Sequence, residues 1–279
     1  MYDQKKSLDL IKSSLKEDIG KGDITTSAII NNSDLGSAQI IVKQNGIIAG
    51  VDIVKTVFKL ADSGLILDAF AEDGDNIFEN MQVFRLSGNI SSILRAERTA
   101  LNFLAHLSGI ATLTAKFVER VRDSGAKITD TRKTTPMLRS LEKYAVKCGG
   151  GVNHRMGLFD MILIKENHIR AAGGIGEAVS RVRKYLANNL INTIIEVETA
   201  NLADVQEAVE SKADRIMLDN MDLNTMRQAV DYIDGRAEVE ASGGISLDTV
   251  AAVAQTGVDF ISVGALTHSA PVLDFSLLL

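Results

Sequence analysis

A threonine-rich loop carries two adjacent cations. Residues 130–136 read Asp-Thr-Arg-Lys-Thr-Thr-Pro, so Arg132 and Lys133 stand together among hydroxyl groups. Arginine offers a planar pair of donors to a carboxylate or phosphate, lysine a point charge, and threonine a hydroxyl. The segment predicts an anion-binding loop, although a solvated basic loop has the same composition.

Two further cationic segments follow. Residues 149–155 read Gly-Gly-Gly-Val-Asn-His-Arg, which puts His154 and Arg155 behind a glycine run that can equally form only a turn. A lone histidine is often structural. Lys165 ends an apolar strand-like run, which predicts that it is buried. A buried lysine needs a partner that stabilises its charge. It can neutralise an anion, form a Schiff base, or pair with Glu198.

Two carboxylates end later strand-like runs. Glu198 follows Ile194–Val197, and Asp219 follows Ile216–Leu218. Such a pair can hold Mg²⁺ through water, bind ribose hydroxyls, or stabilise positive charge developing on a sugar ring. Ion pairing with Lys165 or Arg155 is the structural alternative.

Two glycine-containing motifs end the last strand-like runs. Residues 241–246 read Ala-Ser-Gly-Gly-Ile-Ser, and residues 263–265 read Val-Gly-Ala. Backbone N–H groups after the last strands of a β/α barrel commonly bind a phosphate. Each motif is weak alone, and the two at consecutive strand ends predict a phosphate site.

Regular alternation after residue 125 must position these groups. Six short apolar runs each stop at a polar or glycine residue, and helical segments separate the later ones: 127–130, 161–165, 194–198, 216–219, 238–242 and 260–264. This pattern predicts a parallel sheet, either a small or incomplete barrel or, as the alternative, a doubly wound sheet. In barrels the carboxyl ends of strands carry the chemistry.

Two observations favour the barrel. No glycine-rich dinucleotide fingerprint follows the first strand-like run. Glutamates alternate within two strands, at 196 and 198 and at 238 and 240, and period two puts each pair on one strand face. We therefore expect a polar barrel interior near its mouth. Before it, helical spacing at 4–18 and 51–60, strand-like runs at 38–42 and 81–86, and a helical stretch at 91–121 predict a first domain.

Composition bounds the class of protein. The chain has 279 residues and a net charge of −6, which argues against a nucleic-acid surface. Residues 130–170 nevertheless hold eight Lys or Arg against four acids, an excess that charge counting alone assigns to a solvated basic face before a concave site for a small anion. A single cysteine, Cys148, suggests a reducing compartment. The longest stretch free of charged residues, 99–115, is shorter than the roughly 20 residues of a membrane span, so we expect a soluble protein with no membrane partner.

The chain resembles the quinolinate phosphoribosyltransferase family, also called carboxylating nicotinate-nucleotide pyrophosphorylase. The resemblance covers nearly the whole length and rests on these motifs: EDIGKGDITT at 17–26, RTALNFLAHLSGIAT at 98–112, DTRKTTPMLRSLEKYAVKCGGGVNHRMGL at 130–158, LIKENHI at 163–169, EVE at 196–198, MLDN at 217–220, EASGGI at 240–245 and VGALTHS at 263–269. It implies an N-terminal α/β sandwich domain, 1–106 with the tail 270–279, and an incomplete six- or seven-stranded parallel β/α barrel, 107–269. It also implies a homodimer or a larger assembly of dimers.

The resemblance implies roles residue by residue. A quinolinate pocket would be formed by Arg98, Arg132, Lys133, His154, Arg155 and Lys165, with Thr131 beside them. Lys165, Glu198 and Asp219 would be catalytic, and the two acids would face the ribose and its Mg²⁺. The 5-phosphate would be surrounded by Ser242, Gly243, Gly244, Val263, Gly264 and Ala265. Arg98 would enter the active site of the partner subunit.

The implied reaction joins quinolinate to phosphoribosyl pyrophosphate with loss of CO₂, which gives nicotinate mononucleotide for NAD biosynthesis in the cytoplasm. Met137 and Glu166 depart from the family, which usually has glycine and aspartate there. The alternatives are a non-carboxylating pyridine phosphoribosyltransferase or a molybdenum-transport-associated paralogue. A Schiff-base aldolase using Lys165 and a non-catalytic sugar-phosphate binder are more distant ones.

Overall fold

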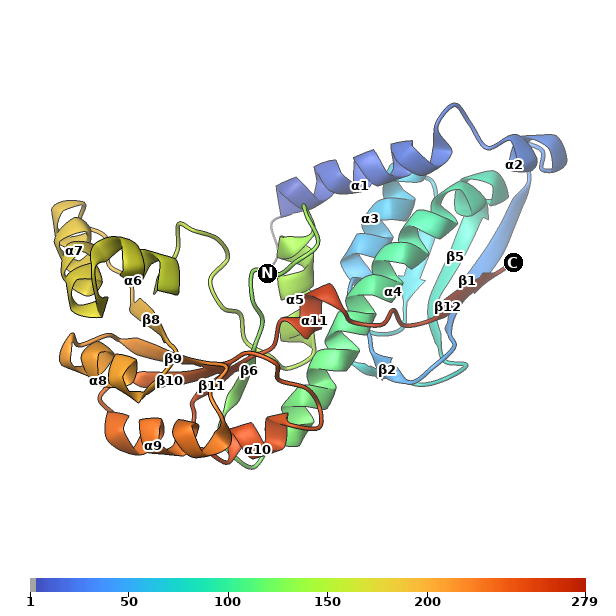
Figure 1. Ribbon diagram of the computed structural model, residues 1–279. Coiled ribbons are helices and arrows are strands. Elements are labelled where there is room, and N and C mark those ends of the chain that lie inside the picture. The colour runs from blue at the N-terminus through green and yellow to red at the C-terminus, as the bar shows by residue number, and fades with distance from the viewer. Residues whose placement is uncertain (1–3) are drawn as a thin grey trace. The chain divides into compact units, whose positions relative to one another are not determined.

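The computed structural model describes residues 4–279, which divide into two compact units (Figure 1). The first unit contains the described residues up to Ala115, then 134–150 and 265–279, and the second contains 116–133 and 151–264. Helix α4 (Ile90–Val121) runs unbroken through the predicted boundary at 106. The domain ranges 1–106 and 107–269 therefore stay predictions.

The first unit contains a four-stranded antiparallel sheet in the order β12-β1-β5-β3. Alternation explains strand β1, because Ala38, Ile40 and Val42 are buried while the residues between them face outward. The strands are β1 (Leu35–Val42), β3 (Ile66–Ala69), β5 (Gln82–Asn89) and β12 (Phe275–Leu278), and β2 (Gly46–Ile47) pairs with β4 (Asn76–Ile77).

Helices supply the other layer of this unit. In α3 (Val51–Ala61) the buried residues Val51, Val54 and Phe58 recur at helical spacing, so one face of the helix packs into the core. The remaining helices are α1 (Gln4–Ile19), α2 (Ile24–Ile29), α5 (Arg139–Cys148) and α11 (Ala265–His268). The predicted N-terminal α/β domain is confirmed as a fold class.

The tail after α11 passes close to α4 at Gly109. A Cβ atom at Gly109 would overlap the carbonyl of Pro271, and the Leu273 N–H donates to the Ala105 carbonyl at 3.0 Å. The tail then continues as β12, which pairs with the outer edge of β1. Glycine is therefore required in the middle of this helix, despite its low helix propensity, to let the two backbones approach.

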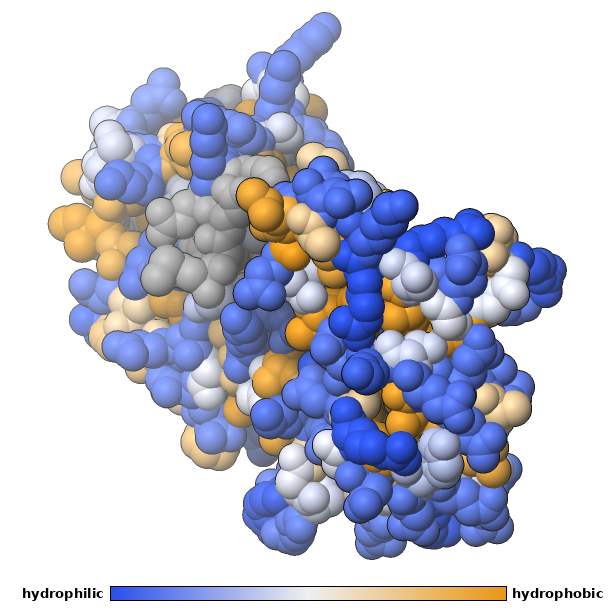
Figure 2. All heavy atoms as spheres, turned by 90° about the vertical axis from the view of Figure 1, so that its left-hand side faces the viewer, coloured by the Kyte–Doolittle hydropathy of each residue, from blue (hydrophilic) through white to orange (hydrophobic). Residues whose placement is uncertain are grey.

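Helix α4 is, among the described residues, long and apolar enough to meet the length and hydropathy criteria of a membrane span. In its most apolar stretch 56% of the residues are buried, as in the core helix of a globular fold. Hydrophilic residues cover most of the face that Figure 2 displays, with hydrophobic residues in smaller groups between them.

The second unit contains six parallel strands in the order β6-β11-β10-β9-β8-β7. They are β6 (Lys127–Thr129), β7 (Ile162–Ile164), β8 (Ile195–Thr199), β9 (Arg215–Asp219), β10 (Glu238–Ser242) and β11 (Phe260–Ser262). The helices between them are α6 (Glu166–Ala172), α7 (Ile175–Asn188), α8 (Leu202–Glu210), α9 (Leu223–Ile233) and α10 (Val250–Ala254). The incomplete β/α barrel predicted from the sequence is confirmed.

The alternating glutamates differ in depth. Glu196 and Glu240 are fully buried, Glu198 is partly buried at the carboxyl end of β8, and Glu238 is half exposed beside Arg215. The expectation that all four lie near the mouth is therefore wrong for three of them. Residues two positions apart on one strand face lie about 7 Å apart along the strand, so such acids fall in different layers of the barrel.

Candidate functional site

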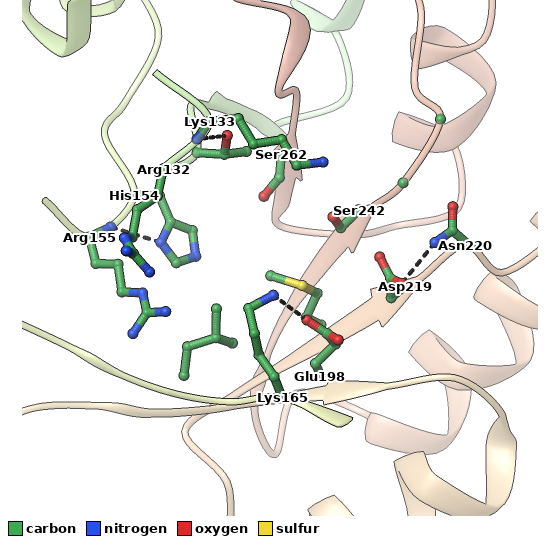
Figure 3. Close-up of a pocket in the computed structure, with 15 residues that line it drawn as sticks. Arg132, Lys133, His154, Arg155, Lys165, Glu198, Asp219, Asn220, Ser242 and Ser262 are labelled. Atoms are coloured by element: carbon green, nitrogen blue, oxygen red, sulfur yellow. Dashed lines mark hydrogen bonds and ion pairs between the residues drawn. The ribbon is translucent and has the colours of Figure 1, made fainter. Parts of the chain in front are cut away.

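A cavity of about 570 Å³ opens at the carboxyl ends of the strands of the second unit (Figure 3). Its wall contains most of the residues that sequence reasoning had singled out: Thr131, Arg132, Lys133, His154, Arg155, Lys165, Glu198, Asp219, Ser242, Gly243 and Gly244. Parallel strands end at one edge of a sheet, and loops from that edge converge on one hollow.

Four predicted residues are not in this wall. Arg98 is exposed on α4, in the first unit, and Ala265 begins α11 in the same unit. Val263 is buried and its N–H donates to the Thr129 carbonyl at 2.9 Å, so that amide is already used by the sheet. Gly264 follows Val263 in the chain and does not line the cavity. Their predicted roles remain predictions.

Lys165 and Glu198 both line the cavity, where they form an ion pair. The Lys165 ammonium lies 2.6 Å from Glu198 Oε2, and Figure 3 shows the lysine directed at that carboxylate. The Lys165 side chain is 47% exposed, so the expectation of a buried lysine is wrong. The ion pair with Glu198 is the structural alternative that the sequence left open for Lys165.

Three other cations surround the same hollow. Arg132 and Lys133 are exposed, and the Lys133 N–H donates to Thr131 Oγ1 at 3.0 Å, which bends the loop. Arg155 is buried, and its Nη1 donates to the Met161 carbonyl at 3.3 Å. Burial, followed by repulsion from Arg132, holds the pKa of the Arg155 guanidinium below its ordinary value. An anion bound between the two arginines would relieve that repulsion.

His154 lines the cavity and is positioned by three contacts. The Asp130 carboxylate, at the end of β6, accepts from the His154 N–H at 3.0 Å. The His154 ring places Nε2 3.0 Å from Glu196 Oε2, while Nδ1 accepts from the Arg155 N–H at 2.7 Å. The ring nitrogens are therefore directed at the protein, and the imidazole is held in place as part of the wall.

Beneath His154, Glu196 and Glu240 form a buried acid pair. Burial is the main reason that the pKa of each carboxyl is raised, and for Glu240 the charge on Glu196 adds to it. Ser262 Oγ donates to Glu240, and Arg215 Nη1 lies 3.4 Å from its other oxygen. His154, Glu196 and Glu240 each offer one atom of the kind that binds a metal ion, and these atoms lie within 4.8 Å of one another. Ser262 and Arg215, however, already bind both oxygens of Glu240.

A glycine turn also lines the cavity. Gly243 and Gly244 have φ of +97° and +61°, values that L side chains rarely adopt, so the Ser242–Gly244 segment depends on glycine there. Such a turn leaves backbone N–H groups uncovered and lets a phosphate approach closely. The pocket thus has four cations, two acids and a glycine turn, a set that suits a substrate with several negative charges.

Sequence reasoning missed four lining residues, Leu163, Met217, Asn220 and Ser262. Leu163, Met217 and Ser262 face inward within strands, where a register is needed to tell inward from outward. Asn220 follows Asp219 directly in the quoted MLDN motif, so its position was a usable signal.

The two departures from the family pattern lie at exposed places. Met137 has φ of +68° and a side chain that is 86% exposed, so a methionine occupies a backbone conformation that glycine adopts without strain. Glu166 begins α6 and pairs with Arg170 at 2.8 Å on the surface of that helix. Neither residue lines the cavity.

Family comparisons cover both parts of the chain. The model of the quinolinate phosphoribosyl transferase N-terminal domain matches residues 23–108, and that of the C-terminal domain matches residues 110–278.

Relatives and solved structures agree with these matches. The chain is 43% identical to quinolinate phosphoribosyltransferase (decarboxylating) 2a, mitochondrial, of Nicotiana tabacum, over 99% of this chain and 82% of the relative. It is 44% identical to a probable nicotinate-nucleotide pyrophosphorylase (carboxylating) of Synechocystis, over 94% and 89%. The solved nicotinate-nucleotide pyrophosphorylase of Francisella tularensis superposes with a TM-score of 0.95 at 42% identity, covering 99% of this chain and 97% of that one. The chain therefore belongs to the quinolinate phosphoribosyltransferase family.

Proposed function

We propose that this chain transfers the phosphoribosyl group of phosphoribosyl pyrophosphate to quinolinate and releases CO₂, pyrophosphate and nicotinate mononucleotide, a step of NAD biosynthesis. The observation that carries the proposal is family membership over nearly the full length, together with a cavity whose four cations face two acids. Two carboxylates on the pyridine ring and the phosphates of the donor supply the negative charge that this cavity matches.

The first step forms the bond from the ring nitrogen to the anomeric carbon of ribose. The nitrogen lone pair forms that bond, and the bond from the carbon to pyrophosphate breaks with its electron pair on the leaving group. Positive charge builds on the sugar meanwhile. Glu198 and Asp219, at the ends of β8 and β9, stabilise this charge, while Arg132, Arg155 and Lys165 hold the anions in line.

The second step removes the carboxylate next to the ring nitrogen. The carbon–carbon bond breaks, CO₂ leaves, and the electron pair stays on the ring carbon beside the cationic nitrogen until it forms a C–H bond with a proton from water. The protein has only to hold the other carboxylate in place. A pocket with several cations suits a dicarboxylate better than a monocarboxylate, which separates this reaction from that of a non-carboxylating paralogue.

Mg²⁺ is proposed as the cofactor, near Glu198 and Asp219. Carboxylate oxygens are the ligands that this hard cation prefers. One oxygen of Glu198 is engaged by Lys165 and one of Asp219 by Asn220, so contact through water and the pyrophosphate fits these acids better than a fully protein-bound ion. When bound, Mg²⁺ neutralises the charge of the leaving pyrophosphate.

A homodimer, alone or in a larger assembly of dimers, is proposed as the working form, with Arg98 serving the cavity of the partner subunit. Two observations support this assignment. Arg98 is exposed on α4, and every residue in the cavity wall belongs to the second unit. A two-fold dimer builds each such shared site twice.

A cytoplasmic location is proposed because the chain has a single cysteine, Cys148, and therefore no internal disulfide. Burial, followed by the charge of Asp73, raises the pKa of its thiol to about 11, which keeps the thiol protonated at neutral pH. The relatives include enzymes whose names give mitochondrial and chloroplastic locations, so the compartment varies within the family. Fractionation of the source cells, with immunodetection of the chain, tests this assignment.

The activity has a direct test. Purified protein is mixed with Mg²⁺, phosphoribosyl pyrophosphate and quinolinate carrying ¹⁴C in the 2-carboxylate, and released ¹⁴CO₂ is counted together with nicotinate mononucleotide by chromatography. Equal amounts of both products are expected, and nicotinate should replace quinolinate poorly. Binding of the donor without any product would instead indicate a non-catalytic sugar-phosphate binder.

A further inference from the structure

Asn220 joins two parts of the cavity that are otherwise separate. It lies between the acid that ends β9 and the glycine turn that follows β10, and it lines the hollow with both of them. Figure 3 shows its amide directed at Asp219. Asn220 is also the last residue of the MLDN motif.

The backbone of Asn220 directs its side chain back over the strand ends. Its N–H donates to the Ser242 carbonyl at 2.9 Å, which extends the parallel pairing of β9 and β10 by one residue. Its φ is +53°, in the left-handed region, where asparagine is one of the few tolerated side chains. When a residue other than glycine has this conformation in a cavity wall, a function of its side chain is favoured.

The amide has a defined orientation. Its Nδ2 lies 2.7 Å from Asp219 Oδ2, and since a carboxylate only accepts, the nitrogen must face Asp219. The rest of the amide then fills the space over Gly243, where an added Cβ atom would overlap it. Gly243 is thus required by this packing as well as by its own φ of +97°.

We propose that Asn220 is a positioning residue that holds the Asp219 carboxylate toward the reacting sugar. This inference rests on the proposed function, because it takes the role of Asp219 from that reaction. An unrestrained carboxylate would sample other rotamers, and the charge it offers the transition state would no longer be pre-organised.

The main test substitutes Asn220→Gly, which keeps the left-handed backbone without strain and removes only the amide. We expect turnover to fall about tenfold to a hundredfold, with quinolinate affinity within about twofold of wild type. Lys212→Gly is the matched control, because Lys212 has a similar φ of +59° and is exposed outside the cavity. Its turnover should equal that of wild type.

A double-variant cycle separates positioning from a general structural role. If Asn220 acts through Asp219, adding Asn220→Gly to Asp219→Asn should lower turnover by no more than about twofold further. Multiplied effects would overturn the proposal, and so would wild-type turnover in Asn220→Gly or a loss confined to quinolinate affinity.

Two further measurements complete the test. Should Asn220→Gly melt well below wild type, Asn220→Asp replaces it, because aspartate keeps the size and tolerates the same φ. Its carboxylate would repel Asp219, so turnover must fall at least as far, and unchanged turnover contradicts the proposal. Wild-type protein assayed alongside distinguishes a failure of the proposed function from a failure of the role proposed for Asn220. Absence of product from wild type refutes the proposed function, whereas an active wild type with an equally active Asn220→Gly refutes only the role of Asn220.

Discussion

Glu196 and Glu198 lie two residues apart on the same face of β8, yet their surroundings are opposite. Glu198 lines the cavity at the mouth of the barrel, partly open to water and 2.6 Å from Lys165. Glu196 is fully buried beside His154 and Glu240, and the pKa of its carboxyl is raised by burial. One residue type, moved by about 7 Å along a strand, thus meets a charged, wet site and then a dry network.

The difference shows how the barrel divides its interior. At the mouth, charges are paired but reachable, so they can exchange a protein partner for a substrate. In the layer below, Glu240 is held by Ser262 and Arg215, Glu196 lies beside His154, and neither acid lines the cavity. We expect changes at the mouth to alter turnover and binding, and changes below to alter stability.

The largest effect should come from the mouth acid Asp219. Asp219→Asn removes charge that acts chiefly in the transition state, so turnover should fall about a hundredfold to a thousandfold, with quinolinate affinity nearly unchanged. Steady-state kinetics and calorimetry measure the two quantities. Persistent turnover with lost quinolinate affinity would assign Asp219 to the binding pocket instead.

The next prediction asks whether one chain alone completes the mouth. Arg98→Ala and Lys165→Ala homodimers should each be nearly inactive. Refolded together in equal amounts, about half of the dimers should be mixed, and activity should return to roughly a quarter of wild type if the sites are shared. Native mass spectrometry verifies the mixed dimers. If these form and no activity returns, Arg98 serves its own subunit.

A smaller effect is expected for the geometry of one mouth cation. Arg132→Lys keeps the charge but loses the planar pair of donors, so quinolinate binding should weaken by about 1.5–3 kcal/mol in calorimetry. Arg170→Lys is the control, because Arg170 is paired with Glu166 on the surface of α6. Equal quinolinate affinity of Arg132→Lys and wild type would remove Arg132 from the pocket.

The smallest effect concerns the buried layer and its dependence on pH. The pKa of Glu240 is raised in the folded state, so folding favours its protonated form. Its contribution to stability is complete below the unfolded pKa and is lost as the pH rises through the folded pKa. Glu240→Gln cannot ionise, so between about pH 5 and 7 its free energy of unfolding should decline by about 1–2 kcal/mol less than that of wild type. Urea unfolding at several pH values measures this, and parallel curves would contradict it.

The sequence predicted the barrel well because its signal is periodic. Each apolar run ends at a polar or glycine residue, and parallel strands bring such ends to one edge, so Lys165, Glu198 and Asp219 can be grouped from the sequence alone. Depth could not be predicted, since it depends on strand tilt and register. Glu240 therefore proved to be buried, and Lys165 proved to be exposed.

Contacts between segments that are distant in the sequence could not be predicted either. Asn220 acquires its place through a left-handed turn and through Gly243, more than twenty positions along the chain. The family resemblance supplied the N-terminal domain and suggested that the tail joins it. Periodicity alone could not have shown that 275–278 would pair with β1.

The pairing of β12 with β1 has a consequence for how the protein folds during synthesis. The first unit takes segments from both ends of the described chain, and the outer edge of β1 has no strand beside it until residues 275–278 have emerged from the ribosome. The strands of the second unit are all synthesised earlier. An unpaired strand edge is a template for association with other chains, so the nascent protein is exposed to aggregation until its last strand docks.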